Sequence, residues 1–517
     1  MATANDEAIF HPQTADSACL CDTAQKQLSS TDPINHIPEE LLCGIFQHYL
    51  ALGGSPRDLV PVCRTWRNLA ISTPRLWSGI LWATSKPSTW RQGWASSERL
   101  IVCRTLEDLR RTLSRAKAAP LDLVVEVDVD AEVFQEGLAL LTEDGRISQW
   151  RKIYFHHSLV PYNDYDFYSH KLSSLDGKLC GLEEADFAIE VPILFDAIAK
   201  TATRLYSLRV ESLCHLLDFP KGDWWKRLRK LEVKVHWMDE WQAMLNNHQR
   251  HERYTTIISS CSNLEELLLF HVPLPTDSWS APPKLLRLTG FETEINFHNH
   301  TFPSTLTHLT IDNNVNHLQG PLILPCLKHL RYTFEESCSL PALGQLIAPV
   351  LERLELSGYT FPSAPDHTME EEFSQIWGND AQSSNRLNPR SLSVTKLHVR
   401  PCRLVPALRH MPAIEEMELA SVLASAQQEF YIPFIVTRRN PVENVVCPRL
   451  RCLTVDLVGQ ERKEVVEQTM SRLAQDRTKR GVPLEKFRLR WSRKEGSANP
   501  SWVDMLSQAR EEKKANE

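Results

Sequence analysis

Apolar side chains near the start of the chain recur at the spacing of an amphipathic helix. The first such set comprises Leu41, Leu42, Ile45, Phe46, Tyr49 and Leu50. Positions three or four residues apart share one face of a helix, so this set predicts a helix with Pro38 in its first turn. The Gly53-Gly54 pair is a typical helix stop, which sets the expected end of the element.

Two further helical elements are expected before residue 82. Ser55-Pro56 predicts the start of a second helix, with serine as the N-cap and proline in the first turn. Thr73-Pro74 breaks this helix and opens a short third element. The apolar positions of both elements are Leu59, Val62, Cys63, Trp66, Leu69, Ala70, Leu76 and Trp77. Such short helices enclose little apolar surface, so we expect a partner or the next domain to complete them.

A repeated strand pattern fills the remainder of the chain. Alternating β-branched residues over 120–130 predict a first strand. From about residue 150 onward the chain repeats a six-residue unit, Leu-x-x-Leu-x-apolar. Strict copies start at Leu205, Leu228, Leu264, Leu306, Leu327, Leu351 and Leu450, and looser copies start at Trp150, Leu285, Val394, Ile414 and Leu484.

The spacing of these units is that of a repeat protein. Copies at 264, 285, 306 and 327 follow one another at intervals of 21 residues. Within a strand, the second leucine and the last apolar residue share one face, and the residue between them points the opposite way. One unit cannot bury its apolar face alone, so we expect stacked copies to share a core. A helical array is the alternative, because Leu-x-x-Leu also occurs on helices.

Composition and charge narrow the class of protein further. The 517 residues include 68 leucines but only 18 glycines, and the formal net charge is −7. This charge disfavours a general nucleic-acid binder. Thirteen cysteines without a Cys-x-x-Cys pair indicate reduced thiols, and therefore a cytoplasmic or nuclear protein. No apolar run is long enough for a transmembrane helix, so no membrane association is expected.

Residues 37–77 closely resemble an F-box. The family pattern of Leu-Pro-x-Glu-Ile/Leu-Leu-x-x-Ile-Phe is matched by the run that begins Ile37-Pro-Glu-Glu-Leu-Leu, with isoleucine in place of the first leucine. The later family elements Asp-Leu, Val-Cys-Arg-x-Trp-Arg-x-Leu and Leu-Trp are matched at Asp58, at Val62 and at Leu76. The whole chain is similar to fungal-type F-box proteins with degenerate leucine-rich repeats.

The resemblance implies an α+β or α/β solenoid, in which a three-helix F-box precedes a horseshoe-like array of leucine-rich repeats. The expected segments are a disordered tail at 1–31, the F-box at 32–82, a helical connector at 83–119, the repeat domain at 120–500 with an insertion at about 362–391, and a C-terminal tail at 501–517.

The resemblance also implies a function, that of a non-catalytic substrate receptor in a Skp–cullin–F-box ubiquitin ligase. The F-box would dock on a Skp-type adaptor, and through it on cullin and RING subunits. The residues expected to form the F-box core and the adaptor surface, without a division between the two, are Ile37, Pro38, Leu41, Leu42, Ile45, Phe46, Leu59, Val62, Cys63, Trp66 and Trp77. The repeats would bind a protein substrate through outward residues that include Arg331, Glu355, His398, Glu418 and Arg488.

Other functions stay open at the level of the sequence. A scaffold protein without ligase activity fits the same pattern, and a nucleic-acid-binding repeat protein is a weaker alternative. Basic runs at 226–230 and 477–494 could contact a phosphate-bearing partner or form a solvated face. No catalytic motif, metal site or cofactor site is expected, because the chain lacks the phosphate-loop, nucleophile-elbow and zinc-helix motifs.

Overall fold

The computed structural model divides the chain into two compact units. Unit 1 comprises Met1–Val124 and Val129–Leu141, and unit 2 comprises Val125–Asp128 and Thr142–Glu517. The residues that the structure describes are 37–83, 100–127, 131–157, 178–187, 192–211, 217, 222–235, 248–272, 281–291, 302–312, 322–334, 346–358, 387–395, 408–409, 411–423, 446–458, 463–479, 481–492, 502–507 and 510–511. The tail expected at 1–31 and most of the insertion expected at 362–391 lie outside them.

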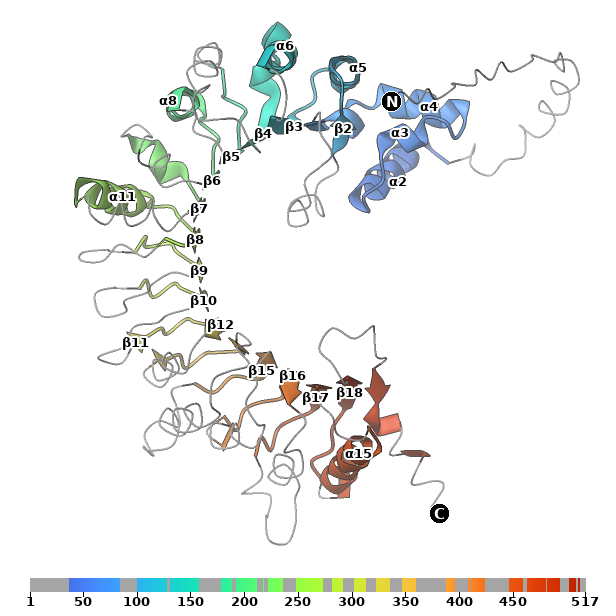
Figure 1. Ribbon diagram of the computed structural model, residues 1–517, viewed down its shortest axis with the longest axis vertical. Helices are drawn as coiled ribbons and strands as arrows, with labels where there is room; N and C mark the ends of the chain where they lie inside the picture. Colours follow the sequence, from blue (N-terminus) through green and yellow to red (C-terminus); the bar gives the residue numbers. More distant parts are fainter. Residues whose placement is uncertain are drawn as a thin grey trace, which may run out of the picture. The chain divides into compact units, whose positions relative to one another are not determined.

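Unit 1 begins with four short helical elements (Figure 1). They are α2 Glu39–Ala51, α3 Pro56–Leu59, α4 Arg64–Ser72 and the 3-10 helix η2 Pro74–Trp77. Ser55 caps α3 as predicted, since its hydroxyl accepts a bond from the backbone N–H of Arg57 and its own N–H donates to Asp58. Phe46 is fully buried and packs edge-to-face on Trp66, with ring centroids 4.9 Å apart.

The prediction of a single second helix from Ser55 onward is wrong, because the structure has two helices there, α3 and α4. Pro61 lies between the two helices, where it lacks the N–H that a continuing helix would need. Cys63 then serves as a new N-cap, and its sulfur accepts a bond from the backbone N–H of Trp66. Trp77 is buried, and its indole N–H donates to the carbonyl of Ala70 at 2.7 Å.

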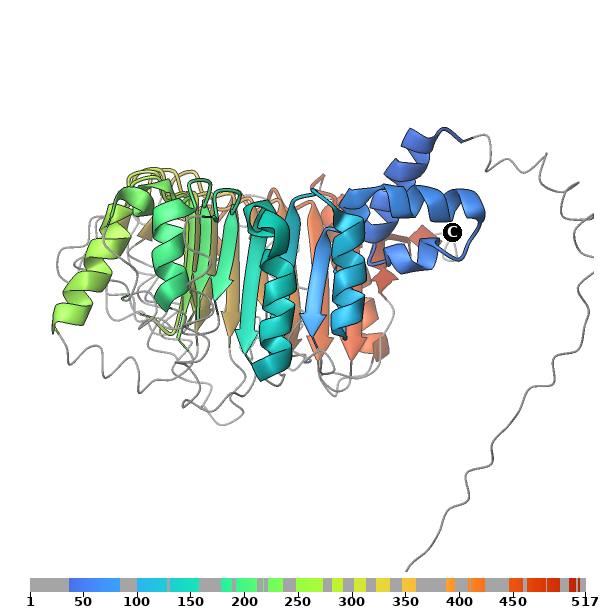
Figure 2. The same ribbon diagram turned by 90° about the horizontal axis from the view of Figure 1, so that it is seen from above.

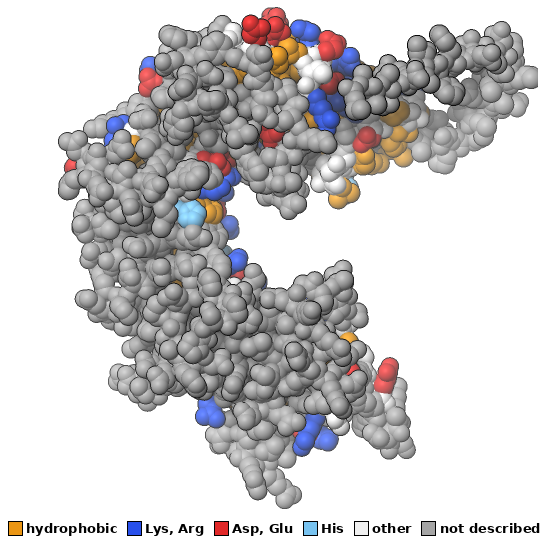
Figure 3. Space-filling view, viewed as in Figure 1, with side chains coloured by type: hydrophobic (Ala, Val, Ile, Leu, Met, Phe, Trp, Pro, Cys, Tyr) orange, Lys and Arg blue, Asp and Glu red, His pale blue; other side chains and the backbone are white. Residues whose placement is uncertain are grey.

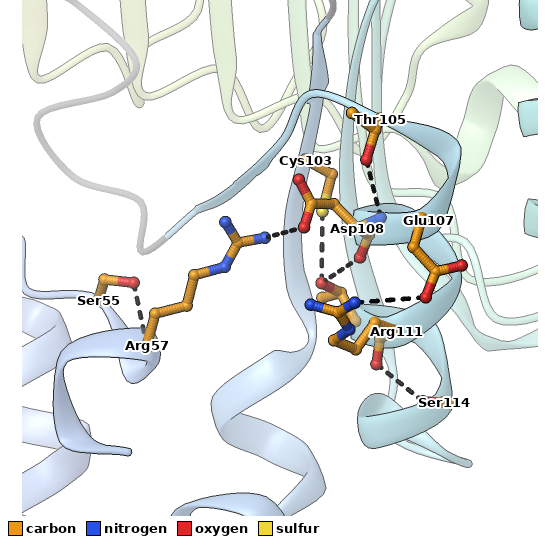
Figure 4. A network of polar contacts seen from close by, with 9 residues as sticks. Ser55, Arg57, Cys103, Thr105, Glu107, Asp108, Arg111 and Ser114 are labelled. Carbon is orange, nitrogen blue, oxygen red and sulfur yellow. Dashed lines mark hydrogen bonds and ion pairs between the residues drawn. The ribbon is translucent and has the colours of Figure 1, made fainter. Parts of the chain in front are cut away.

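The rest of unit 1 mixes strands and helices. Its elements are β1 Gly79–Ala83, β2 Ile101–Cys103, α5 Leu106–Ala116, the first part of β3 Leu121–Val127 and most of α6 Ala131–Thr142. The connector expected to be helical therefore also contains a strand, β2, which pairs in parallel with β1. Figure 4 shows how polar contacts join α3 to α5: Arg57 forms an ion pair with Asp108, whose backbone N–H is capped by the Thr105 hydroxyl.

Unit 2 is built on a large, mostly parallel sheet. Its strands are β4 Trp150–His157, β5 Glu184–Phe187, β6 Ser207–Val210, β7 Lys230–Lys234, β8 Glu266–Phe270, β9 Arg287–Phe291, β10 His308–Asp312, β12 His329–Phe334, β14 Arg353–Gly358, β15 Ser391–Thr395, β16 Glu416–Leu423, β17 Cys452–Val458 and β18 Lys486–Ser492. Each pairs in parallel with the next in this order. Figure 2 shows them side by side and running in the same direction.

The repeated unit explains why the strands form where they do. At Leu205, Leu264, Leu306 and Leu351 the backbone N–H donates to the carbonyl three residues earlier, at 3.0 to 3.3 Å. This bond closes a turn just before each strand. The second leucine and the last apolar residue of the unit are buried, as at Leu208 and Val210 of β6. Every predicted unit except that at Val394 therefore contains a strand at the expected place.

Two units were misplaced or missed. Val394 is the last apolar position of its unit and not the first, because the paired buried residues of β15 are Leu392 and Val394. The strand β5 belongs to a unit that was not predicted, in which Ala185 and Phe187 occupy the buried positions. Ala185 stands where the pattern has its second leucine, so the pattern does not predict this unit.

Helical elements and two-residue strands are the other described elements of unit 2. They are η4 Glu143–Gln149, α8 Pro192–Thr201, η7 Asp223–Arg227, α11 His248–Ser260, α15 Lys463–Lys479, β11 Leu322–Ile323, β13 Leu346–Ile347 and β19 Val503–Asp504. Within this unit, α8, α11 and α15 lie on the outer side of the curved row of strands (Figure 1). The segment expected to be a C-terminal tail contributes β19, which pairs antiparallel with β18. The described part of the chain is thus a mixed α/β fold.

Candidate interaction surfaces

Helix α2 exposes a continuous row of large apolar side chains. Leu41 is 61% exposed, Ile45 48%, Tyr49 37% and Leu52 76%. Steps of four residues place Leu41, Ile45 and Tyr49 along one stripe of the helix, beside the buried stripe that contains Phe46, and Leu52 follows as the C-cap residue of the helix. Hydrophobic side chains are visible on the surface over α2 in Figure 3. We call Leu41, Ile45, Tyr49 and Leu52 the α2 stripe.

The structure divides the predicted adaptor-binding residues into three groups by exposure. Exposed are Pro38, Leu41, Ile45 and Val62; partly buried are Ile37, Cys63 and Trp66; and buried are Leu42, Phe46, Leu59 and Trp77. Only the first two groups can contact another protein without unfolding of the helices. Tyr49 and Leu52 belong with them but were not predicted, although Tyr49 lies one turn from Ile45 on the same stripe.

The second candidate surface is the polar side of the sheet in unit 2, which we call the strand face. In-register pairing aligns the outward residue of each unit with that of the next. This central row runs Tyr154, Asp186, Arg209, Glu232, Leu268, Thr289, Thr310, Arg331, Glu355, Ser393, Glu418, Thr454 and Arg488. Charged side chains are visible along the inner side of the strand row in Figure 3.

Four of the five predicted substrate-binding residues lie in this central row. Arg331 and Glu355 are neighbours in it, with their closest charged atoms 4.0 Å apart, and Glu418 and Arg488 follow on later strands. His398 lies outside the described residues, and Ser393 occupies the position expected for it because of the misplaced unit at Val394.

The row begins with a charged cluster that the sequence analysis did not identify. Arg209 contacts three carboxylates: Nη1 lies 3.5 Å from Asp186 Oδ2, Nη2 lies 3.0 Å from Glu211 Oε1, and Nε lies 3.2 Å from Glu232 Oε1. Burial, reinforced by the charges of Glu211 and Glu232 against the opposing effect of Arg209, raises the pKa of Asp186 well above its usual value. The strict unit at Leu205 places Arg209 at the outward position, so the repeated pattern could have identified this residue.

Most of the described basic residues in the two runs have structural partners. In the first run, Lys226 pairs with Asp223 and Arg229 with Glu265. In the second, Arg477 is fully buried and donates to the carbonyls of Leu450 and Val482 at 3.2 Å. These contacts favour the interpretation of the runs as structural and solvated positions.

The described residues were also examined for metal-binding groups and membrane-spanning helices. Among the described residues, no three His, Cys, Asp or Glu side chains gather as a metal-binding group. Within the same part of the chain, no helix combines the length and apolar character needed to cross a bilayer. No protein-family model matches the chain, and no curated protein is found as a relative.

Proposed function

We propose that this protein is a non-catalytic substrate receptor of a Skp–cullin–F-box ubiquitin ligase. In this proposal the helices α2 to η2 are the F-box, and the sheet of unit 2 is a leucine-rich-repeat domain that holds a protein substrate. The protein would act in the cytoplasm or nucleus.

The observation that carries the proposal is the α2 stripe. A helix that already buries Leu42, Phe46 and Leu50 on one face has no need of a second apolar face for its own folding. Exposed rows of this kind are typical of surfaces that a partner covers. The match to the F-box pattern in the same residues supports a Skp-type adaptor as that partner.

The strand face supports the second half of the proposal. Its central row is mostly a mixture of acidic, basic and hydroxyl side chains on successive strands, with Arg331 next to Glu355 and Glu418 next to Ser393. Broad polar surfaces on stacked repeats suit the binding of other proteins.

The proposal is tested by purifying the full chain together with a Skp-type adaptor and a cullin. We expect Ile45→Glu to abolish co-purification, because a carboxylate would be buried at the interface without a partner. The matched control is Ile323→Glu, since Ile323 is 61% exposed but lies on β11 of unit 2. Equal retention of the adaptor by both variants would refute the F-box assignment. If the complex forms but transfers ubiquitin to no bound protein, the alternative of a scaffold protein without ligase activity is supported instead.

A further inference from the structure

A second row of outward side chains runs parallel to the central row of the strand face. It is formed by the third residue of each unit, two positions before the central one, and therefore points to the same side of the sheet. Over four neighbouring strands this row is Arg287, His308, His329 and Arg353. We call these four residues the basic row.

The two histidines of the basic row are stacked. Their ring centroids lie 4.5 Å apart with an interplanar angle of 3°, and the Thr307 hydroxyl lies 2.9 Å from His308 Nδ1. Both rings are partly exposed, and the flanking arginines are exposed. Neighbouring strands are about 4.8 Å apart, so the row spans about 14 Å, the length of a few extended residues.

Acidic side chains near the basic row are already engaged. Arg353 Nε lies 2.7 Å from Glu355, which also faces Arg331 in the central row. Glu266, opposite Arg287 on β8, forms an ion pair with Lys230 at 3.6 Å. The charged and titratable groups that surround His308 are Arg287, Lys328, His329 and Arg331, with Glu352 paired to Lys328 at 3.4 Å. The patch is therefore positive even while the His308 ring is neutral.

We propose that the basic row binds an acidic segment of a partner protein, lying across strands β9 to β14. Carboxylate or phosphate groups of that segment would contact the guanidinium groups of Arg287 and Arg353 at the two ends, with the stacked histidines between them. The inference deepens the proposed function, and rests on it only in taking the partner to be the captured substrate.

Binding of such a segment is coupled to protonation of His308. Burial, followed by the charges of His329, Arg287 and Lys328, lowers the pKa of His308, so the free site holds a neutral ring near pH 7. A bound anion reverses this preference by stabilising the imidazolium form. Each proton taken up strengthens binding by up to about tenfold for each unit by which the pH falls.

The test uses the full chain and fluorescently labelled peptides of alternating glutamate and glycine, measured by anisotropy at about pH 8 and about pH 6. Glutamate stays ionised over this interval, since its ordinary pKa is about 4.3. Control peptides carry glutamine, and a second pair compares phosphoserine with serine at about pH 8. We expect the glutamate and phosphoserine peptides to bind, and the glutamate peptide to bind about three- to tenfold more tightly at the lower pH.

Two variants assign the binding to the basic row. Arg287→Gln is expected to weaken it by about fivefold, the effect of one exposed charge pair. Lys486→Gln is the matched control, because Lys486 is an exposed cation at the same position of its unit on β18. His308→Gln together with His329→Gln is expected to remove the pH dependence. Near-ultraviolet circular dichroism verifies that each variant keeps its fold.

The inference is overturned if glutamine peptides bind as well as glutamate peptides, or if Arg287→Gln and Lys486→Gln weaken binding equally. It is also overturned if single-stranded DNA binds more tightly than either acidic peptide. Adaptor co-purification on the same preparations separates this result from the proposed function. Loss of peptide binding with the adaptor retained refutes the inference alone. Peptide binding by a chain that never retains the adaptor refutes the ligase proposal alone.

Discussion

Arg209 is the cation around which the three carboxylates of the buried cluster gather, so its replacement tests how the charges of the strand face are balanced. Arg209→Met keeps most of the side-chain volume and removes the charge. Glu211 and Glu232 would lose their shared cationic partner, and Asp186, at 2% exposure, would be held still more firmly in its protonated form. Removing one member of a buried ion pair costs about 3–5 kcal/mol, and we expect this range at neutral pH.

Asp186→Asn makes the opposite prediction from the same geometry. Burial raises the pKa of Asp186, so the folded chain holds a proton that the unfolded chain has released above about pH 4. Stability therefore falls as the pH rises from about 4 through the folded-state pKa, and then levels off. Asparagine has no such dependence, so the variant should equal the wild type in stability near pH 4 and be more stable than the wild type at higher pH.

Both changes are measured by urea unfolding over a pH series, with hydrogen exchange of β5, β6 and β7 to localise the effect. The cost of Arg209→Met should shrink toward about pH 4, where the carboxylates become neutral. Two results would refute the reasoning. One is a loss of stability in Asp186→Asn that is largest at neutral pH, since it would mean that the ionised carboxylate contributes favourably. The other is a cost of Arg209→Met that does not change with pH.

Three further predictions concern packing and buried hydrogen bonds. Phe46→Ala should destabilise unit 1 by about 3–5 kcal/mol by leaving a cavity, whereas Ile45→Ala on the adjoining exposed stripe should change stability by less than about 0.5 kcal/mol, both measured by urea unfolding. Arg477→Met should cost about 2–4 kcal/mol through unsatisfied carbonyl groups, seen as faster hydrogen exchange at the start of β17, and an equal rate would contradict this. Gly137→Ala should cost about 1–3 kcal/mol in thermal unfolding, because its methyl group would overlap the Trp82 ring, and a neutral effect would show that the ring can move.

The strands were predictable because the unit that encodes them is local. A turn, a leucine before the strand and two alternating buried residues lie within six positions, and the same local bonds recur at Leu264 and Leu306. Prediction failed where one of the buried positions carried another side chain, as at Ala185 of β5, which replaces the second leucine of the unit. It failed again at Pro61, where an apolar period continues across a residue that ends the helix.

The charge pattern of the strand face depends on neighbours that are distant in sequence. Asp186 and Arg209 come into contact because β5 and β6 pair in register, and neither sequence neighbourhood reveals the other. The outward positions themselves could be listed from the repeated unit. Which of them would be buried, such as Asp186, or exposed, such as Arg331, follows from the packing around each strand and not from the unit.

Helix α2 shows why burial on a single helix could not be assigned from periodicity. The set Leu42, Phe46 and Leu50 and the α2 stripe both follow steps of three or four residues, and the two sets are offset by one position. One position corresponds to about 100° of rotation, so together they give an apolar arc wider than one packing surface requires. The pattern alone does not distinguish the stripe that packs on α4 from the stripe left exposed. A Pro38→Ala, Phe46→Ala double variant would therefore weaken the packing of unit 1 as well as any adaptor contact, whereas Ile45→Glu changes the exposed stripe alone.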